Sequence, residues 1–282
     1  NFNDWDFFFF FFSWAKSTLD LAGGGVASAD GQTALKTGNY SLYNEEWPAD
    51  STVAILNHWK DDVKLDMKRF EYWSMDNEME IWSGTHSDLP LTVTQQFLVE
   101  RYLDVAKKAK KAWKDIKLTG PVAANEWQWC GVDSDPNAAE ERNYCWLEYF
   151  IKKVAEAQKA SGVKLLDVLD IHWYPTEKTY EDRINWHRVF FDTTYVYPGA
   201  NGIKKVNGGW DNSIVKEFIF KRLNDWMNAY FGKNHGIGLG LTETDLTTDD
   251  AMLTALIYAS FLGTFMDNGV ELFTPWSWGD GM

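Results

Sequence analysis

Two glutamates each end an apolar run that is typical of a buried strand. Glu78 lies in YWSMDNEMEIW, where the run stops at Asp76, Asn77 and Glu78, and Glu243 ends GIGLGLTE in the same way. Parallel barrel strands present functional side chains at their carboxyl ends, so both glutamates are predicted to reach one rim. Two carboxyl groups across one bond are the usual machinery of glycoside hydrolysis. For either glutamate taken alone, the start of a solvated loop is the alternative.

A third run, LLDVLDIHWYP, carries Asp170, His172 and Tyr174 at a spacing of two residues. Side chains two apart share one face of a strand, so those nearest its carboxyl end are predicted to point into the same site. His172 and Tyr174 are therefore candidate substrate-binding residues, with Tyr174 placed to donate a hydrogen bond to Glu243. Core packing followed by a turn is the alternative for this aromatic sequence.

The elements that carry these residues alternate between strands and helices. Strands are predicted over residues 71–77, 117–124, 165–172, 236–244 and 271–278. Helices are predicted over residues 51–62, 92–114, 140–160, 213–231 and 250–268. This alternation is typical of parallel βαβ units, and it predicts an α/β fold, a (β/α)8 TIM barrel, as a single catalytic domain over residues 1–282.

The N-terminal part of the chain is too short for a complete barrel. Five strands are clear after residue 65, and three more βα units would need roughly 30 residues each. We therefore expect a barrel that is incomplete or gapped at the N-terminus and cut after the eighth strand, with breaks in the chain path within the first 50 residues. The run from Phe7 to Phe12 has neither helical nor strand periodicity, and a buried helix is the expectation there.

The composition restricts the class of partner. The chain has 27 basic and 41 acidic residues, a net charge of −14, which argues against nucleic acid and anionic membrane surfaces. No run approaches the roughly 20 apolar residues of a membrane span. The 16 tryptophans suit sugar rings as well as a core, so a neutral polysaccharide is compatible with this composition.

The motifs in order, YWSMDNEMEIW, LTGPV, LLDVLDIHWYP, LGLTETD and ELFTPWSWGDG, resemble glycoside hydrolase family 44 over roughly residues 51–282. This resemblance implies an endo-acting, retaining β-1,4-glucanase on a TIM barrel, without a cofactor or catalytic metal. A xyloglucanase, a mixed glucanase/xylanase and a catalytically silent carbohydrate-binding barrel are the alternatives. The family also carries a β-sandwich built from both chain ends, which is not visible in this sequence. A β-glucan substrate further implies secretion, and a monomer is expected.

The resemblance assigns roles to single residues. Glu78 would be the acid/base and Glu243 the nucleophile, and Asn77 would hold the sugar 2-hydroxyl. The family usually has proline after Asn-Glu, whereas this chain has Met79, which alters the loop exit and keeps the Asn-Glu pair. Repulsion and partial burial should raise the pKa of the acid, while neighbouring groups hold the nucleophile charged.

Three tryptophans are candidate sugar platforms. Trp276 closes the last strand, where the clan places such a ring, while Trp127 follows the second clear strand and Trp210 lies in a long loop that helps to build the family's cleft. Trp14, Trp73 and Trp226 are predicted to be core residues instead.

The two cysteines, Cys130 and Cys145, fit neither a zinc pattern nor a thiol redox motif. A local disulfide and two unpaired thiols are both compatible with their spacing.

Overall fold

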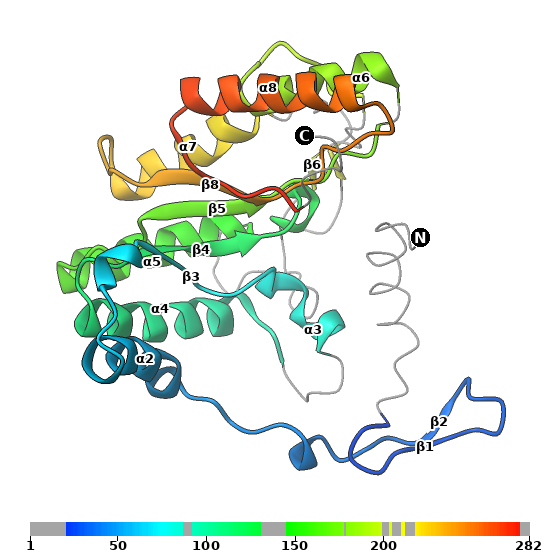
Figure 1. Ribbon diagram of the computed structural model, residues 1–282, viewed down its shortest axis with the longest axis vertical. Helices are drawn as coiled ribbons and strands as arrows, with labels where there is room; N and C mark the ends of the chain where they lie inside the picture. Colours follow the sequence, from blue (N-terminus) through cyan, green and yellow to red (C-terminus); the bar gives the residue numbers. More distant parts are fainter. Residues whose placement is uncertain are drawn as a thin grey trace.

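The computed structural model describes residues 21–86, 92–130, 145–177, 179–198, 203–204, 210–211 and 218–276 (Figure 1). Its centre is a sheet of five parallel strands. In spatial order these are β3 (Tyr72–Ser74), β4 (Lys117–Ala123), β5 (Val168–His172), β8 (Gly238–Glu243) and β9 (Val270–Phe273). The five predicted strands are thus confirmed as parallel neighbours, and their carboxyl ends share one edge of the sheet.

Helices follow the strands and lie outside the sheet (Figure 1). Helix α4 begins after Thr94, whose Oγ1 accepts a hydrogen bond from the Phe97 amide, and α8 begins after Asp250, which caps two amides in the same way. Neighbouring helices pack in the pairs α2 with α4, α4 with α5, and α5 with α7. The bounds are α2 (Ala49–Asn57), continued by η2 (His58–Asp62), α4 (Gln95–Ala112), α5 (Trp146–Ser161), α6 (Tyr180–Asn185), continued by η6 (Trp186–Phe190), α7 (Ile219–Phe231) and α8 (Ala251–Asp267).

The two faces of the sheet differ in polarity. The face toward the helices is apolar, and Gly120 on it is so close to α4 that a Cβ atom there would lie 2.7 Å from the Tyr102 ring. The buried apolar residues on this face include Leu118, Leu169, Ile171, Leu239 and Leu241. Because side chains alternate along a strand, the opposite face carries polar residues, namely Lys117, Thr119, Asp170, His172, Thr242 and Glu271.

Side chains from the two edge strands meet across this polar face. Tyr72 of β3 donates its hydroxyl to Glu271 Oε1 of β9 at 2.7 Å, and Lys117 Nζ lies 2.7 Å from the same oxygen. In a flat sheet, edge strands separated by three others would be roughly 19 Å apart at the usual strand spacing. The contact therefore requires a strongly curled sheet, and its polar face becomes the lumen of a partial barrel.

The N-terminal segment adds no strand to this barrel within the described residues. β1 (Val26–Ala27) and β2 (Ala34–Lys36) form an antiparallel hairpin that lies away from the sheet, and η1 (Tyr40–Leu42) follows it (Figure 1). The run from Phe7 to Phe12 lies outside the described residues. The expected gaps in the chain path and the assignment of all 282 residues to one domain stay predictions.

Two strands end earlier than their apolar patterns predict. β3 ends at Ser74 because the chain turns immediately afterwards, and β9 ends at Phe273. The predicted starts of the helices at 140 and 213 lie outside the described residues, and the observed helices begin at Trp146 and Ile219. Among the residues that the structure describes, no helix has the length and apolar character needed to cross a bilayer.

Candidate active site

Glu78 is presented by a tight turn after β3. Asp76 has φ 99° and Glu78 has φ 43°, values in the left-handed region that cost side-chain-bearing residues about 1–3 kcal/mol each. The Glu78 amide donates to the carbonyl of Val122, at the end of β4, at 2.9 Å. Val122 also has a positive φ, 58°, which is unusual for a β-branched residue. The backbone is therefore strained at the turn that positions Glu78, as is common at functional sites.

Glu243 is the last residue of β8 and lies beside the end of β5. It is in register with His172, and its carbonyl accepts a hydrogen bond from the Trp173 amide at 3.0 Å. The Tyr174 hydroxyl donates to Glu243 Oε2 at 2.9 Å. The predicted contact between Tyr174 and Glu243 is thus present, and the carboxyl group is fixed by the neighbouring strand.

His172 brings the two glutamates together. Its Nδ1 lies 2.9 Å from Glu78 Oε1 and 3.4 Å from Glu243 Oε2, and its side chain is only 1% exposed. One atom from each of the three groups lies within 4.8 Å of the others. Retaining glycosidases hold their carboxyl groups roughly 5–5.5 Å apart, so this spacing suits a direct attack better than the wider inverting arrangement. A cation could also fit among these three groups, and no other such cluster occurs within the described ranges.

Burial dominates the electrostatics of this site. It raises the pKa of Glu243, and the negative charge of Glu78 acts in the same direction, whereas His172 and Tyr174 act to lower it. The sequence predicts that neighbouring groups keep Glu243 charged. His172 and Tyr174 do favour the charged form, but burial outweighs their effect on the pKa. For His172, burial lowers the pKa, while the hydrogen bond to Glu78 and the charges of Glu243 and Glu78 outweigh it, so the pKa is raised.

Two further carboxyl groups are buried next to the pair. Glu80 is 1% exposed, its Oε1 accepts from the Ala124 amide at 2.7 Å, and burial raises its pKa to about 8. Asp170 is fully buried, accepts a hydrogen bond from Thr242 Oγ1, and has a pKa raised by burial to about 6. Glu80 is not among the site residues predicted from the sequence. The only local signal is its place between the apolar residues Met79 and Ile81.

Asn125 is another site residue that the sequence did not indicate. Its Oδ1 accepts from the Tyr174 amide at 2.7 Å, and its Nδ2 donates to the Tyr174 carbonyl at 3.3 Å. The side chain therefore fixes the backbone of the residue that holds Glu243. No sequence signal marks it, because the two residues are 49 positions apart.

The remaining predicted site residues fall into two groups. Asn77 is exposed beside Glu78. The Trp276 amide donates to the carbonyl of Thr244, directly after β8, and the Trp276 side chain is 57% exposed. Both lie at the same edge as the carboxyl pair. Trp127 and Trp210 have backbones in η5 (Glu126–Gln128) and β7 (Trp210–Asp211), but their side chains lie outside the described ones.

Of the three tryptophans predicted to be core residues, Trp73 and Trp226 pack against the core. Trp14 lies outside the described residues.

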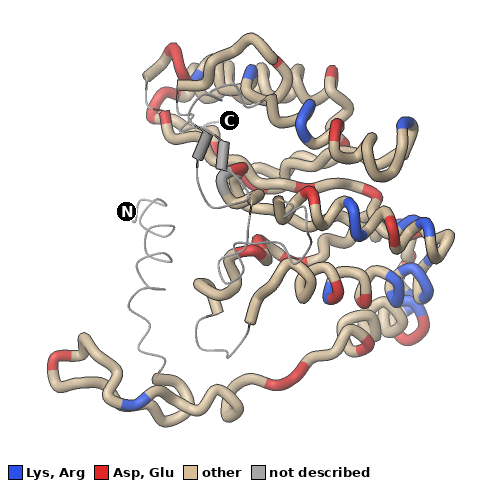
Figure 2. The backbone as a smooth tube through the Cα atoms, turned by 180° about the vertical axis from the view of Figure 1, so that it is seen from behind, with Lys and Arg blue, Asp and Glu red and all other residues tan. Residues whose placement is uncertain are grey.

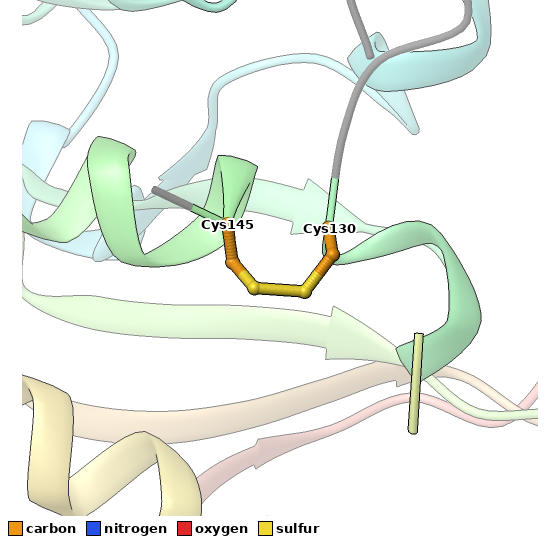
Figure 3. Close-up of a disulfide and its surroundings, with 2 residues drawn as sticks. All are labelled: Cys130 and Cys145. Atoms are coloured by element: carbon orange, nitrogen blue, oxygen red, sulfur yellow. A yellow bond between two sulfur atoms is a disulfide. The ribbon is translucent and has the colours of Figure 1, made fainter. Parts of the chain in front are cut away.

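The two cysteines form a disulfide between the segment after η5 and the start of α5 (Figure 3). Their Cα atoms are 3.9 Å apart. Of the two alternatives that the sequence left open, the structure contains the disulfide, which joins Cys130 to the residue that precedes α5.

Comparisons with known proteins identify the family of this chain. The sequence model of glycoside hydrolase family 44 matches residues 16–177. Endoglucanase A of Paenibacillus lautus is 25% identical over 222 residues, which cover 72% of this chain and 30% of that protein. The chain thus spans less than a third of this relative's length.

Solved structures show the same fold. Cel44A, a family 44 endoglucanase from Clostridium thermocellum, matches with a TM-score of 0.65 and 26% identity, over 81% of this chain and 46% of that one. CelM2, a bifunctional glucanase-xylanase from a metagenome library, matches with a TM-score of 0.71 and 19% identity, over 89% of this chain and 50% of that one. The described sheet is therefore part of an α/β barrel.

Proposed function

Because this chain belongs to glycoside hydrolase family 44, we propose that it is an endo-acting, retaining glycosidase that cleaves β-1,4 bonds in cellulose-like glucans. One observation carries the proposal: Glu78 and Glu243, 165 residues apart in the sequence, share His172, and one oxygen of each lies within 4.8 Å of the other. We assign Glu243 as nucleophile and Glu78 as acid/base.

In the first step Glu243 attacks the anomeric carbon. Tyr174 holds Oε2, whereas no described residue donates a hydrogen bond to Oε1, so Oε1 is the attacking oxygen. The bond from Oε1 to the anomeric carbon forms while the glycosidic bond breaks, and Glu78 gives its proton to the leaving oxygen. Tyr174 keeps its proton throughout, because burial and the charge of Glu243 raise its pKa well above the usual value.

In the second step water replaces Glu243 at the anomeric carbon. Glu243 is an ester at this stage and has lost its negative charge, so the repulsion that it exerts on Glu78 disappears. Glu78 is then stabilised as a carboxylate by His172 at 2.9 Å, and it accepts a proton from the attacking water. Two inversions restore the β configuration.

Asn77 and Trp276 are proposed sugar contacts, because both are exposed at the edge that carries the carboxyl pair. Xyloglucan and xylan are the second candidate substrates. Relatives of the same fold are a bifunctional glucanase-xylanase and a Paenibacillus polymyxa xyloglucanase. A polymeric substrate places the proposed activity outside the cell. We propose that the enzyme acts as a monomer, and Glu78, His172 and Glu243 need no partner chain in order to meet.

The test is hydrolysis of carboxymethylcellulose, xyloglucan and xylan by the purified chain, with Glu243→Gln as the control for contaminating activity. Proton NMR of the first products should show the β-anomer. Appearance of the α-anomer first would refute the retaining assignment, and inactivity on all three polymers would favour a carbohydrate-binding barrel without catalysis.

A further inference from the structure

Glu80 lies two residues after Glu78, in the short helix η4 (Met79–Ile81), and its carboxyl group is buried. Oε1 accepts from the Ala124 amide at 2.7 Å, whereas Oε2 has no hydrogen-bond partner among the described residues. A buried polar atom without a partner costs about 1–3 kcal/mol, so an apolar side chain of the same size would serve the fold better. Its presence beside the proposed acid/base needs a functional explanation.

The end of β4 is connected to both proposed catalytic groups. On one side, Val122 accepts from the Glu78 amide at 2.9 Å, and Ala124 donates to Glu80. On the other side, Asn125 holds the backbone of Tyr174, whose hydroxyl binds Glu243. Three of these connections are made by Val122 of β4 and by Ala124 and Asn125, which directly follow β4. Displacement of the Glu78 turn from β4 would therefore change the position of Glu78 relative to Glu243.

We propose that Glu80 is a positioning residue for Glu78, and this inference rests on the proposed function. Its carboxyl group fixes the strained turn to Ala124 and so determines where Glu78 meets the leaving oxygen. Two backbone hydrogen bonds, from the Met75 amide to Thr119 and from the Glu78 amide to Val122, hold the turn against β4 up to Glu78. Glu80 holds the turn on the C-terminal side of Glu78, through the Ala124 amide.

The neutral form of Glu80 suits this role. The charged groups that face it are Glu78 on its own turn and His172 on β5. A neutral carboxyl group still accepts the Ala124 hydrogen bond and adds no charge next to Glu78. Glutamine has the same shape and the same acceptor, so it should preserve the connection, whereas methionine fills the space and removes it.

The experiment compares two substrates that differ in their need for an acid. An unactivated cello-oligosaccharide requires protonation of its leaving oxygen, whereas a dinitrophenyl β-cellobioside does not. We expect Glu80→Met to lower kcat/KM for the oligosaccharide about 100-fold, the effect of a misplacement of about 1 Å, and kcat/KM for the aryl glycoside less than about 3-fold. Glu80→Gln should restore most of the rate on both.

The matched control is Asn125→Ala, which removes the connection between the end of β4 and Tyr174. It loosens Tyr174 and hence the nucleophile, so kcat/KM should fall by similar factors on both substrates. Should Glu80→Met not fold, Glu80→Asp keeps the carboxyl group and shortens its reach, and it must show the same dependence on the leaving group.

Equal losses on both substrates in the Glu80 variants would overturn the inference and leave the proposed function standing. Failure of Glu80→Gln to restore the rate would also overturn it. An inactive wild-type protein on both substrates would instead overturn the proposed function, and this inference with it.

Discussion

The lumen of the curled sheet has two ends that contain similar groups in different electrostatic settings. Where the strands begin, Glu271 binds the Tyr72 hydroxyl and Lys117 Nζ, each at 2.7 Å. Where the strands end, Glu243 binds the Tyr174 hydroxyl at 2.9 Å and lies 3.4 Å from His172. Each end therefore has a glutamate, a tyrosine hydroxyl and a side-chain nitrogen, which belongs to Lys117 at one end and to His172 at the other.

The positive charge of Lys117 distinguishes the first end from the second. Burial would raise the pKa of Glu271, but hydrogen bonds from Lys117 and Tyr72 outweigh it, and the pKa is lowered. At the other end burial prevails, and the pKa of Glu243 is raised. Lysine and arginine residues are concentrated on the side of the molecule where the strands begin (Figure 2). A permanent cation stabilises an ionised structural carboxylate, whereas acids grouped around one histidine can exchange protons, as catalysis requires.

The largest expected effect tests whether only one end is catalytic. Glu243→Gln removes the nucleophile and should lower kcat roughly 10⁵-fold on every substrate, because no glycosyl ester can form. Glu271→Gln removes the equivalent carboxylate at the other end and should change kcat less than about 3-fold. Steady-state hydrolysis of a cello-oligosaccharide measures both, and equal losses would abolish the distinction between the ends.

The second prediction separates the two carboxyl groups within the catalytic end. Glu78→Ala should lower kcat/KM roughly 10³–10⁴-fold on an unactivated glucan, since general acid catalysis is lost. A dinitrophenyl glycoside should still form the glycosyl-enzyme and then stall, and azide should restore turnover from the vacated side. Rescue of Glu243→Ala by azide without rescue of Glu78→Ala would reverse the roles.

A third prediction gives the two ends opposite pH dependences of stability. The pKa of Glu80 is about 8 in the folded protein against 4.5 for the ordinary group, so the folded state binds more protons between these values and stability falls as pH rises through this range. The total is roughly 4–5 kcal/mol at about 1.4 kcal/mol per pH unit. Asp170, at about 6, acts in the same direction. Urea unfolding from pH 4.5 to 8 should show a shallower slope in Glu80→Gln.

Glu271 should contribute in the opposite direction. Its lowered pKa stabilises the folded protein above the ordinary value of 4.5, and this contribution is lost as pH falls through the folded-state value. Glu271→Gln should therefore reduce the loss of stability in acid and leave the slope toward pH 8 unchanged. If Glu271→Gln lost stability in acid as steeply as the wild type, the pair of Glu271 with Lys117 would make no net contribution to stability.

The smallest expected effect concerns the connection between the edge strands. Lys117 and Glu271 are about one third exposed, so solvent screens their attraction, and Lys117→Met should lower the free energy of unfolding by only about 1 kcal/mol. Urea unfolding at low and high salt measures it, with the difference from wild type shrinking in salt. A loss of several kcal/mol would mean that this contact holds the curl of the sheet.

Local patterns in the sequence were sufficient for much of the fold. Apolar runs of strand length separated by amphipathic stretches predict the five parallel strands and the main helices, because those patterns depend on neighbouring residues. Glu78 and Glu243 follow from the same patterns, since the end of an apolar run marks the end of a strand. The motifs around them were specific enough to indicate the family.

The exact strand ends and the connections inside the site depended on the tertiary structure. β3 stops at Ser74 because Asp76 and Glu78 adopt left-handed conformations, which the apolar pattern around them does not encode. The contacts of His172 with Glu78, Glu80 with Ala124 and Tyr72 with Glu271 join residues 94, 44 and 199 positions apart. Burial and charge at such contacts set the pKa values of the site, and they arise only when the curled sheet brings distant strands together.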